Sequence, residues 1–127
     1  LRDMAALCAE LGMFVLLEAF DREDLDRAMG LFAGSAADGL LMGLNTRDLR
    51  RLRVHPERLA ELAGAFPDGF SRVAESGISS VEDAAKAAGL GYDMALVGTA
   101  LMRSPQPGGL VSDMLVTGRR IRSGGET

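Results

Sequence analysis

The run Gly39-Leu-Leu-Met-Gly-Leu44 consists of apolar and small residues, and it passes directly into the polar sequence Asn45-Thr46-Arg47-Asp48. Three further runs have a similar form: Phe14–Ala19, Ser71–Glu75 and Met94–Val97. Each is short, and together they are mostly apolar rather than alternating between apolar and polar residues. This pattern is typical of parallel strands that are covered on both faces. We therefore predict four strands at these positions.

Segments with helical periodicity lie before, between and after these runs. The predicted helices are Arg2–Leu11, Glu23–Phe32, Pro56–Ala65, Val81–Ala88 and Gly108–Arg119. Strands that alternate with helices at this spacing predict βαβ units and a parallel sheet, which is an α/β fold. We expect one such domain over residues 1–122, followed by a disordered tail at 123–127. Methionines in apolar surroundings are predicted to be core residues: Met13, Met42, Met94 and Met102.

Residues at the expected helix starts support these boundaries. Asp21 can cap the helix predicted at 23–32, with Asp24 three residues later. Ser79 and Glu82 match a capping box ahead of the helix predicted at 81–88. Pro56 suits a first helical position, where a missing N–H group is tolerated.

Composition excludes several classes of protein. The chain has 127 residues, 47% of them hydrophobic, with a formal charge of −4, so it is not intrinsically disordered. No apolar run approaches the roughly 20 residues that a membrane helix requires, and no signal-type start is present. We therefore expect no membrane partner. We also expect a cytoplasmic location, because the single cysteine, Cys8, cannot form an internal disulfide, as is common in reducing compartments. The acidic balance argues against nucleic acid as a partner.

Sequence motifs for several common chemistries are missing. The chain has no GxxxxGK[ST] loop, no GxGxxG fingerprint, no GxSxG elbow and no paired metal-ligand spacing. We expect neither a cofactor nor a metal ion.

Polar residues gather just after the predicted strands, where parallel α/β folds assemble their sites. Glu18 and Glu75 each end an apolar run, and they could act as an acid/base pair if their strand ends converge. The alternative is that each pairs with a nearby arginine. Asn45 and Arg47 lie two residues apart in an extended segment, so both could point into the same site.

Gly77 and Gly98 suggest a phosphate site. A glycine that directly follows a strand lets the backbone approach a ligand closely. The segment Gly98–Met102, which includes Thr99, could form a short helical turn whose N–H groups face an anion. Barrel enzymes often bind phosphate between the loops after their last two strands. The alternative is that both glycines only allow tight turns.

Four segments, in this order, resemble the indole-3-glycerol phosphate synthase family: Leu17–Asp21, Gly43–Leu49, Glu75–Ile78 and Leu96–Arg103. The resemblance runs from about Leu1 to about Leu115. It implies a (βα)8 TIM barrel. It also implies the decarboxylating ring closure of 1-(2-carboxyphenylamino)-1-deoxyribulose 5-phosphate to indole-3-glycerol phosphate in tryptophan biosynthesis.

The same resemblance implies a role for each residue at the strand ends. Glu18 matches a glutamate that transfers protons around the dehydration, and Asn45 matches an asparagine that positions the substrate. Glu75 matches a further catalytic residue near the substrate. The remaining matches are the substrate-binding Arg47 and Ser76, and Gly77, Gly98 and Thr99 on the phosphate-binding loops.

The departures from the family are equally informative. The family's catalytic lysines and a glutamate lie on earlier strands that this chain lacks, and Lys86, its single lysine, lies on a predicted helix. A complete barrel takes about 250 residues. We therefore expect a half-barrel that corresponds to strands 5–8, inactive alone, with a phosphorylated small molecule as its substrate.

Four strands cannot close a barrel, so the half-barrel leaves strand edges and apolar surface open. We expect the missing N-terminal half or a second copy of the chain to cover them. One alternative is a non-catalytic, phosphate-binding half-barrel that dimerises. Another is a relative of phosphoribosylanthranilate isomerase, which the N-x-R-D-L segment disfavours.

Overall fold

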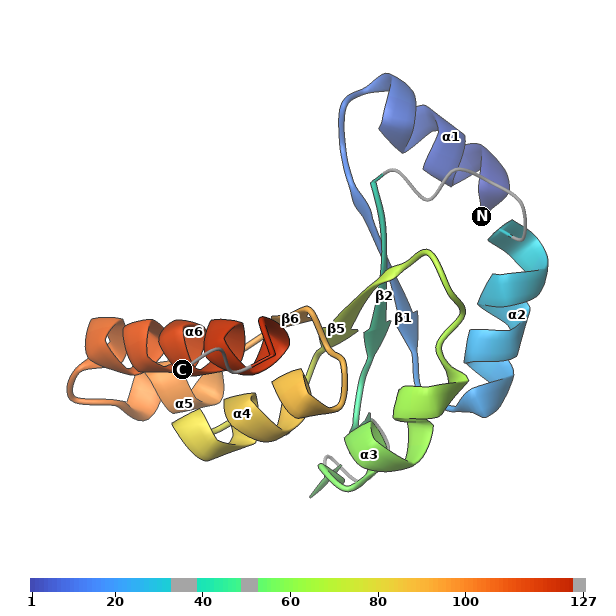
Figure 1. The fold of residues 1–127 in the computed structure, drawn as a ribbon. Coiled ribbons are helices and arrows are strands. Elements are labelled where there is room, and N and C mark those ends of the chain that lie inside the picture. The colour runs from blue at the N-terminus through green and yellow to red at the C-terminus, as the bar shows by residue number, and fades with distance from the viewer. Residues whose placement is uncertain (33–38, 49–52, 125–127) are drawn as a thin grey trace.

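The computed structural model describes residues 1–32, 39–48 and 53–124 (Figure 1). Its main sheet has four strands in the order β1-β2-β5-β6. These are β1 (Val15–Ala19), β2 (Leu40–Leu44), β5 (Ser71–Ala74) and β6 (Met94–Ala95). The helices are α1 (Arg2–Glu10), α2 (Arg22–Phe32), α3 (Arg58–Leu62), α4 (Val81–Gly89), α5 (Thr99–Arg103) and α6 (Pro107–Arg122), and a 3-10 turn, η1 (Ala63–Ala65), extends α3.

The four predicted strands are confirmed, although β5 ends one residue and β6 two residues earlier than expected. Of the tail predicted at 123–127, Ser123 and Gly124 form a turn, and residues 125–127 lie outside the described residues. No helix in the described part of the chain is long and apolar enough to cross a bilayer.

The order of the strands in the sheet follows their order in the chain. All three pairings are parallel, with Leu17 opposite Met42, Gly43 opposite Val73, and Val73 opposite Met94. A doubly wound sheet reverses its strand order at a switch point, whereas a barrel adds each βα unit beside the last. In Figure 1, α1 and α2 lie beside β1 and β2, and α4, α5 and α6 gather beside β5 and β6. The chain is therefore an α/β half-barrel, as predicted.

The core lies on the face of the sheet that the helices cover. Met42 and Leu44 are fully buried there, and they belong to one cluster with Leu25 and Phe32 of α2. Complete burial of such a side chain stabilises the fold by about 1.5–3 kcal/mol. The sheet is less well covered elsewhere, since Leu96, which follows β6, is 51% exposed.

Only one of the four methionines predicted as core residues is buried. Met42 is inaccessible, but Met13, Met94 and Met102 are 57%, 42% and 88% exposed. Met13 precedes the edge strand β1, and Met94 lies on the edge strand β6. The prediction was wrong for these residues because an apolar local context does not show whether a neighbouring element is present to cover it.

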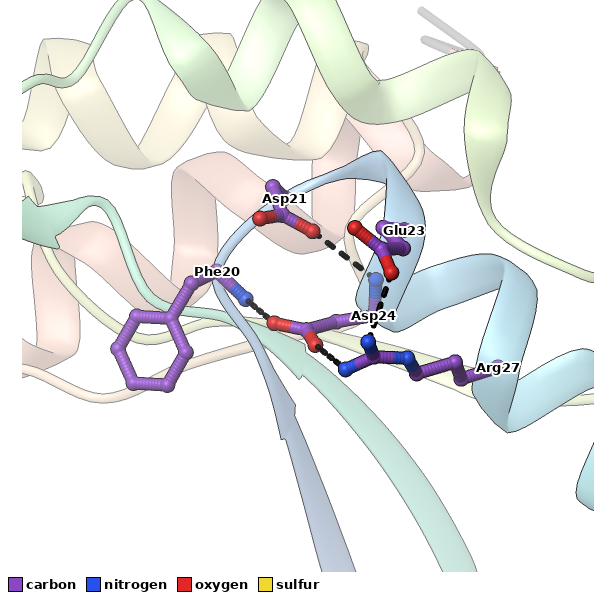
Figure 2. Close-up of polar contacts among 5 residues, drawn as sticks. All are labelled: Phe20, Asp21, Glu23, Asp24 and Arg27. Atoms are coloured by element: carbon purple, nitrogen blue, oxygen red, sulfur yellow. Dashed lines mark hydrogen bonds and ion pairs between the residues drawn. The ribbon is translucent and has the colours of Figure 1, made fainter.

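Asp21 caps α2, as predicted (Figure 2). Its Oδ1 accepts a hydrogen bond from the backbone N–H of Asp24 at 3.0 Å, and the Asp24 carboxylate accepts one from the N–H of Phe20 at 3.0 Å. One turn later, Arg27 pairs with Glu23 at 2.7 Å and with Asp24 at 3.6 Å. The two bonds to backbone N–H groups satisfy donors that have no helical partner, and they fix the turn that leads from β1 into α2.

The capping box predicted before α4 is shifted by one residue. The N-cap is Ser80, whose Oγ accepts a hydrogen bond from the N–H of Asp83 at 3.1 Å. The Asp83 carboxylate accepts bonds from the N–H and the hydroxyl of Ser79 at 3.0 and 2.7 Å. Glu82 pairs instead with Lys86 at 3.0 Å. Two serines precede two acidic residues here, so the sequence pattern fits either register.

The segment after β2 departs furthest from the prediction. Pro56 lies in a turn, and α3 begins two residues later, at Arg58. A short antiparallel pair, β3 (Arg47–Asp48) and β4 (Arg53–Val54), lies between β2 and α3. Strands of two residues are too short to produce a periodic pattern, so they could not be predicted.

Candidate functional site

Glu18 and Glu75 lie together, although β2 separates the strands that carry them. Glu18 is on β1, and Glu75 directly follows β5. Burial, a hydrogen bond with Glu18 and the charge of Glu18 together raise the pKa of Glu75 from 4.5 to about 8. Because this pKa lies above 7, the Glu75 carboxyl is mostly protonated at pH 7, and its buried Oε1 has no hydrogen-bond partner among the described residues.

The two carboxyl groups therefore converge, as one reading of the sequence required. The alternative reading placed an arginine beside each of them. Among the described residues, no arginine or lysine nitrogen lies within 4 Å of either carboxylate.

Asn45 connects Glu18 to the loop after β5. Its Nδ2 donates a hydrogen bond to Glu18 Oε1 at 2.6 Å, and its Oδ1 accepts one from Ser76 Oγ at 3.1 Å. The Oδ1 also accepts the backbone N–H of Arg47 at 2.9 Å. Because a backbone N–H can only donate, this last contact fixes which end of the amide faces Glu18. Asn45 thereby holds the Glu18 carboxylate as an acceptor.

A pocket of about 690 Å³ opens beside this group of residues. The residues predicted from the sequence that line it are Arg47, Glu75, Ser76, Gly77, Gly98 and Thr99. Arg103 of α5 also lines it. Two guanidinium groups together with serine and threonine hydroxyls favour an anionic ligand, because each can donate hydrogen bonds to anionic oxygens.

The two glycines in this pocket differ in whether the backbone conformation requires glycine. Gly77 has a φ of 88°, and a Cβ there would lie 3.1 Å from Pro56 Cβ, so the turn itself requires glycine. Gly98 has a φ of −114°, and no atom lies within 4 Å of the position of its Cβ. The geometry of the tight turn is therefore enough to explain a glycine at position 77. It does not explain the glycine at position 98. The segment that starts there forms α5, as predicted.

Arg103 and Gly43 contribute to the site without having been assigned a role from the sequence. Arg103 lies four residues after Thr99, one turn along α5, so helical spacing could have placed both on one side of the pocket. Gly43 contacts the side chain of Glu75, which is distant in the sequence, and no local pattern signals such a contact. Lys86 lies on α4, pairs with Glu82 and does not line the pocket.

Comparison with protein families identifies the chain. A model described as indole-3-glycerol phosphate synthase matches residues 1–114. The chain belongs to the indole-3-glycerol phosphate synthase family. A curated relative of that name from Micrococcus luteus is 41% identical over 101 residues, which cover 80% of this chain and 35% of the relative. One from Chlorobium limicola is 37% identical over 106 residues, covering 84% and 39%.

The chain thus spans about two-fifths of the length of these indole-3-glycerol phosphate synthases. The Amycolatopsis orientalis BexX/CysO complex has a chain that superposes with a TM-score of 0.57 at 25% identity, over 94% of this chain and 48% of that one. A mandelate oxidase variant with an FMN adduct gives 0.56 at 22% identity, over 96% and 39%. These likenesses concern the fold alone, and in each the half-barrel matches less than half of a larger chain.

Proposed function

We propose that this chain provides the C-terminal half of the active site of an indole-3-glycerol phosphate synthase, a decarboxylating lyase of tryptophan biosynthesis. The reaction closes the ring of 1-(2-carboxyphenylamino)-1-deoxyribulose 5-phosphate with loss of CO2 and water. The observation that carries the proposal is the group formed by Glu18, Asn45 and Glu75 at the carboxyl edge of the sheet, where barrel enzymes place their catalytic residues.

The geometry supports different tasks for the two carboxyl groups. The Glu75 carboxyl keeps its proton at neutral pH because its pKa is raised to about 8, so it can donate a proton to a leaving hydroxyl group. Glu18 transfers protons around the same dehydration, while Asn45 holds its carboxylate in place. Neighbouring titratable groups with different environments are the usual basis of acid/base assignments in enzymes.

The substrate phosphate is assigned to the pocket lined by Arg47, Arg103, Gly77, Gly98 and Thr99. A titration with inorganic phosphate, followed by amide NMR, tests this assignment in the chain itself. We expect shifts at Gly77 and Gly98, weakened several-fold by Arg103→Gln and unchanged by Arg120→Gln on the exposed surface of α6. Binding without shifts at these glycines contradicts the assignment.

The remaining functional groups are proposed to come from a complementary half-barrel with four βα units. Within the described residues, the edge strands β1 and β6 each have an unpaired side, and Phe14 beside β1 is 68% exposed. An apolar hollow of about 750 Å³ lies between α6 and the strand residues Leu16 and Leu41, and Leu96, which follows β6, also lines it. A partner that continues the sheet at both edges and brings the lysines of the family would cover these surfaces and complete the site.

Complementation tests the whole proposal. The chain is mixed with the part of the Chlorobium limicola relative that it does not match, and formation of indole-3-glycerol phosphate is measured. We expect turnover only in the mixture, lost with Glu18→Gln and retained with Glu61→Gln, an exposed glutamate of α3. A stable one-to-one complex without turnover contradicts the lyase assignment. Turnover by the chain alone, abolished by Glu18→Gln, contradicts the expected inactivity.

A second candidate function is a non-catalytic half-barrel that binds a phosphorylated molecule and dimerises. The observation that favours it is that this chain itself supplies the anion-binding groups Arg47, Thr99 and Arg103 of the pocket. A phosphate-binding homodimer that does not associate with the complementary half would support this candidate against the lyase. For either function we keep the cytoplasm as the proposed compartment, because the single cysteine has no partner for an internal disulfide.

A further inference from the structure

Gly43 lies between the two strands that carry the acidic pair. It is opposite Glu18 on β1 and opposite Val73 on β5, in the middle of the sheet. The space that a side chain would fill at this position is taken by Glu75. A Cβ built on Gly43 would lie 1.8 Å from Glu75 Oε1, 2.6 Å from its Cδ and 2.9 Å from its Cγ.

The Glu75 side chain therefore crosses over β2. Adjacent strands are about 4.8 Å apart, so the backbones of β1 and β5 are separated by about 10 Å. A side chain at the end of β5 reaches one on β1 only by passing above the strand between them. At Gly43 the intervening strand has no side chain that would block this path.

Nothing in the backbone of Gly43 requires glycine. It is absent from the residues with positive φ, and it lies inside a strand, where glycine is less favourable than residues with side chains. We infer that Gly43 is a positioning residue for the acidic pair, because the missing side chain lets Glu75 lie across β2 and meet Glu18. Its importance for catalysis rests on the proposed function, but the geometry can be tested without turnover.

The Gly43→Ala substitution provides the test. The new methyl group would push the carboxyl of Glu75 away from Glu18 and toward the pocket, where Arg47 and Arg103 are the charged residues. Both burial and the contact with Glu18 raise the pKa of Glu75, so this movement would lower it. Asn45, which lies outside the acidic pair, would keep its hydrogen bond to Glu18.

The readout is the 13C signal of the Glu75 and Glu18 carboxyl carbons as a function of pH in the 127-residue chain. We expect the Glu75 midpoint to fall from about 8 toward 4.5 in Gly43→Ala, by about two pH units or more. Gly64→Ala is the control, since no atom lies within 4 Å of its new Cβ, and it should leave the midpoint unchanged. An unchanged midpoint in Gly43→Ala overturns the inference.

A double variant covers the case in which Gly43→Ala does not fold. Glu75→Ala removes all three atoms that the new methyl group meets, so Gly43→Ala combined with Glu75→Ala should fold as Glu75→Ala does. A double variant that remains unfolded contradicts the inference. Failure of the proposed function can be told apart from failure of this inference. If the complemented barrel shows no turnover, the proposed function fails, but the effect of Gly43→Ala on the Glu75 titration is still expected.

Discussion

At the scale of single residues, the site contains two side chains whose burial is not fully compensated. Glu75 is held beside another carboxyl group, and Thr46 is fully buried with no hydrogen-bond partner for its hydroxyl among the described residues. Both lie in the segments that follow β2 and β5. Burial of such groups lowers the free energy of unfolding, and substitutions at these positions can measure the loss.

Glu75 should make stability depend on pH. Its pKa is about 8 in the folded chain against an ordinary value of 4.5, so the folded state binds this proton more tightly. The resulting stabilisation is complete below about pH 4.5 and is lost as the pH rises through 8. Urea denaturation at pH 5 and pH 8 should show a fall in unfolding free energy that Glu75→Gln largely removes. The same fall in both proteins would count against a raised pKa.

Thr46→Val should stabilise the chain. The substitution keeps the shape of the side chain and removes a buried hydroxyl that has no partner, so we expect a gain of about 1 kcal/mol in unfolding free energy. Thr46→Ser is the matched variant, because it keeps the hydroxyl and loses a buried methyl group, and it should cost about 1 kcal/mol. A loss of stability in Thr46→Val would show that the hydroxyl is satisfied in solution.

At the scale of helices and strands, most elements could be predicted, and the differences have specific causes. β1 and β2 follow from short apolar runs, and Asp21 marks the start of α2. The paired strands β3 and β4 are too short to detect. That Glu75 meets Glu18 could be foreseen only as a possibility, because it depends on the empty space at Gly43, on a strand between them.

The register of the α4 cap can be tested by two substitutions. Ser80→Ala removes the acceptor for the N–H of Asp83 and should cost about 1 kcal/mol of unfolding free energy. Glu82→Gln should have little effect, because its ion pair with Lys86 is exposed. Thermal unfolding of both variants decides between the two registers. A larger effect of Glu82→Gln would restore the box predicted from the sequence.

At the scale of the whole molecule, the half-barrel combines a buried core with large apolar side chains that remain exposed. Phe14→Ser should change the unfolding free energy by less than about 0.5 kcal/mol, because this side chain is mostly exposed. Leu25→Ala, on the covered face, should cost about 2–5 kcal/mol. Light scattering should show less self-association in Phe14→Ser, and weaker binding to the complementary half. A large loss of unfolding free energy in Phe14→Ser would show that Phe14 packs against other residues of the chain.

The two sheet edges that are unpaired in the described part of the chain differ in length, so strand addition from another molecule should occur mainly at one of them. β6 offers two residues to an incoming strand, whereas β1 offers five, of which Glu18 is the only charged one. Amyloid-like strand addition is hindered by a charge in an exposed edge strand. Glu18 should therefore oppose fibril growth at the β1 edge, and Glu18→Gln should shorten the lag before fibrils form.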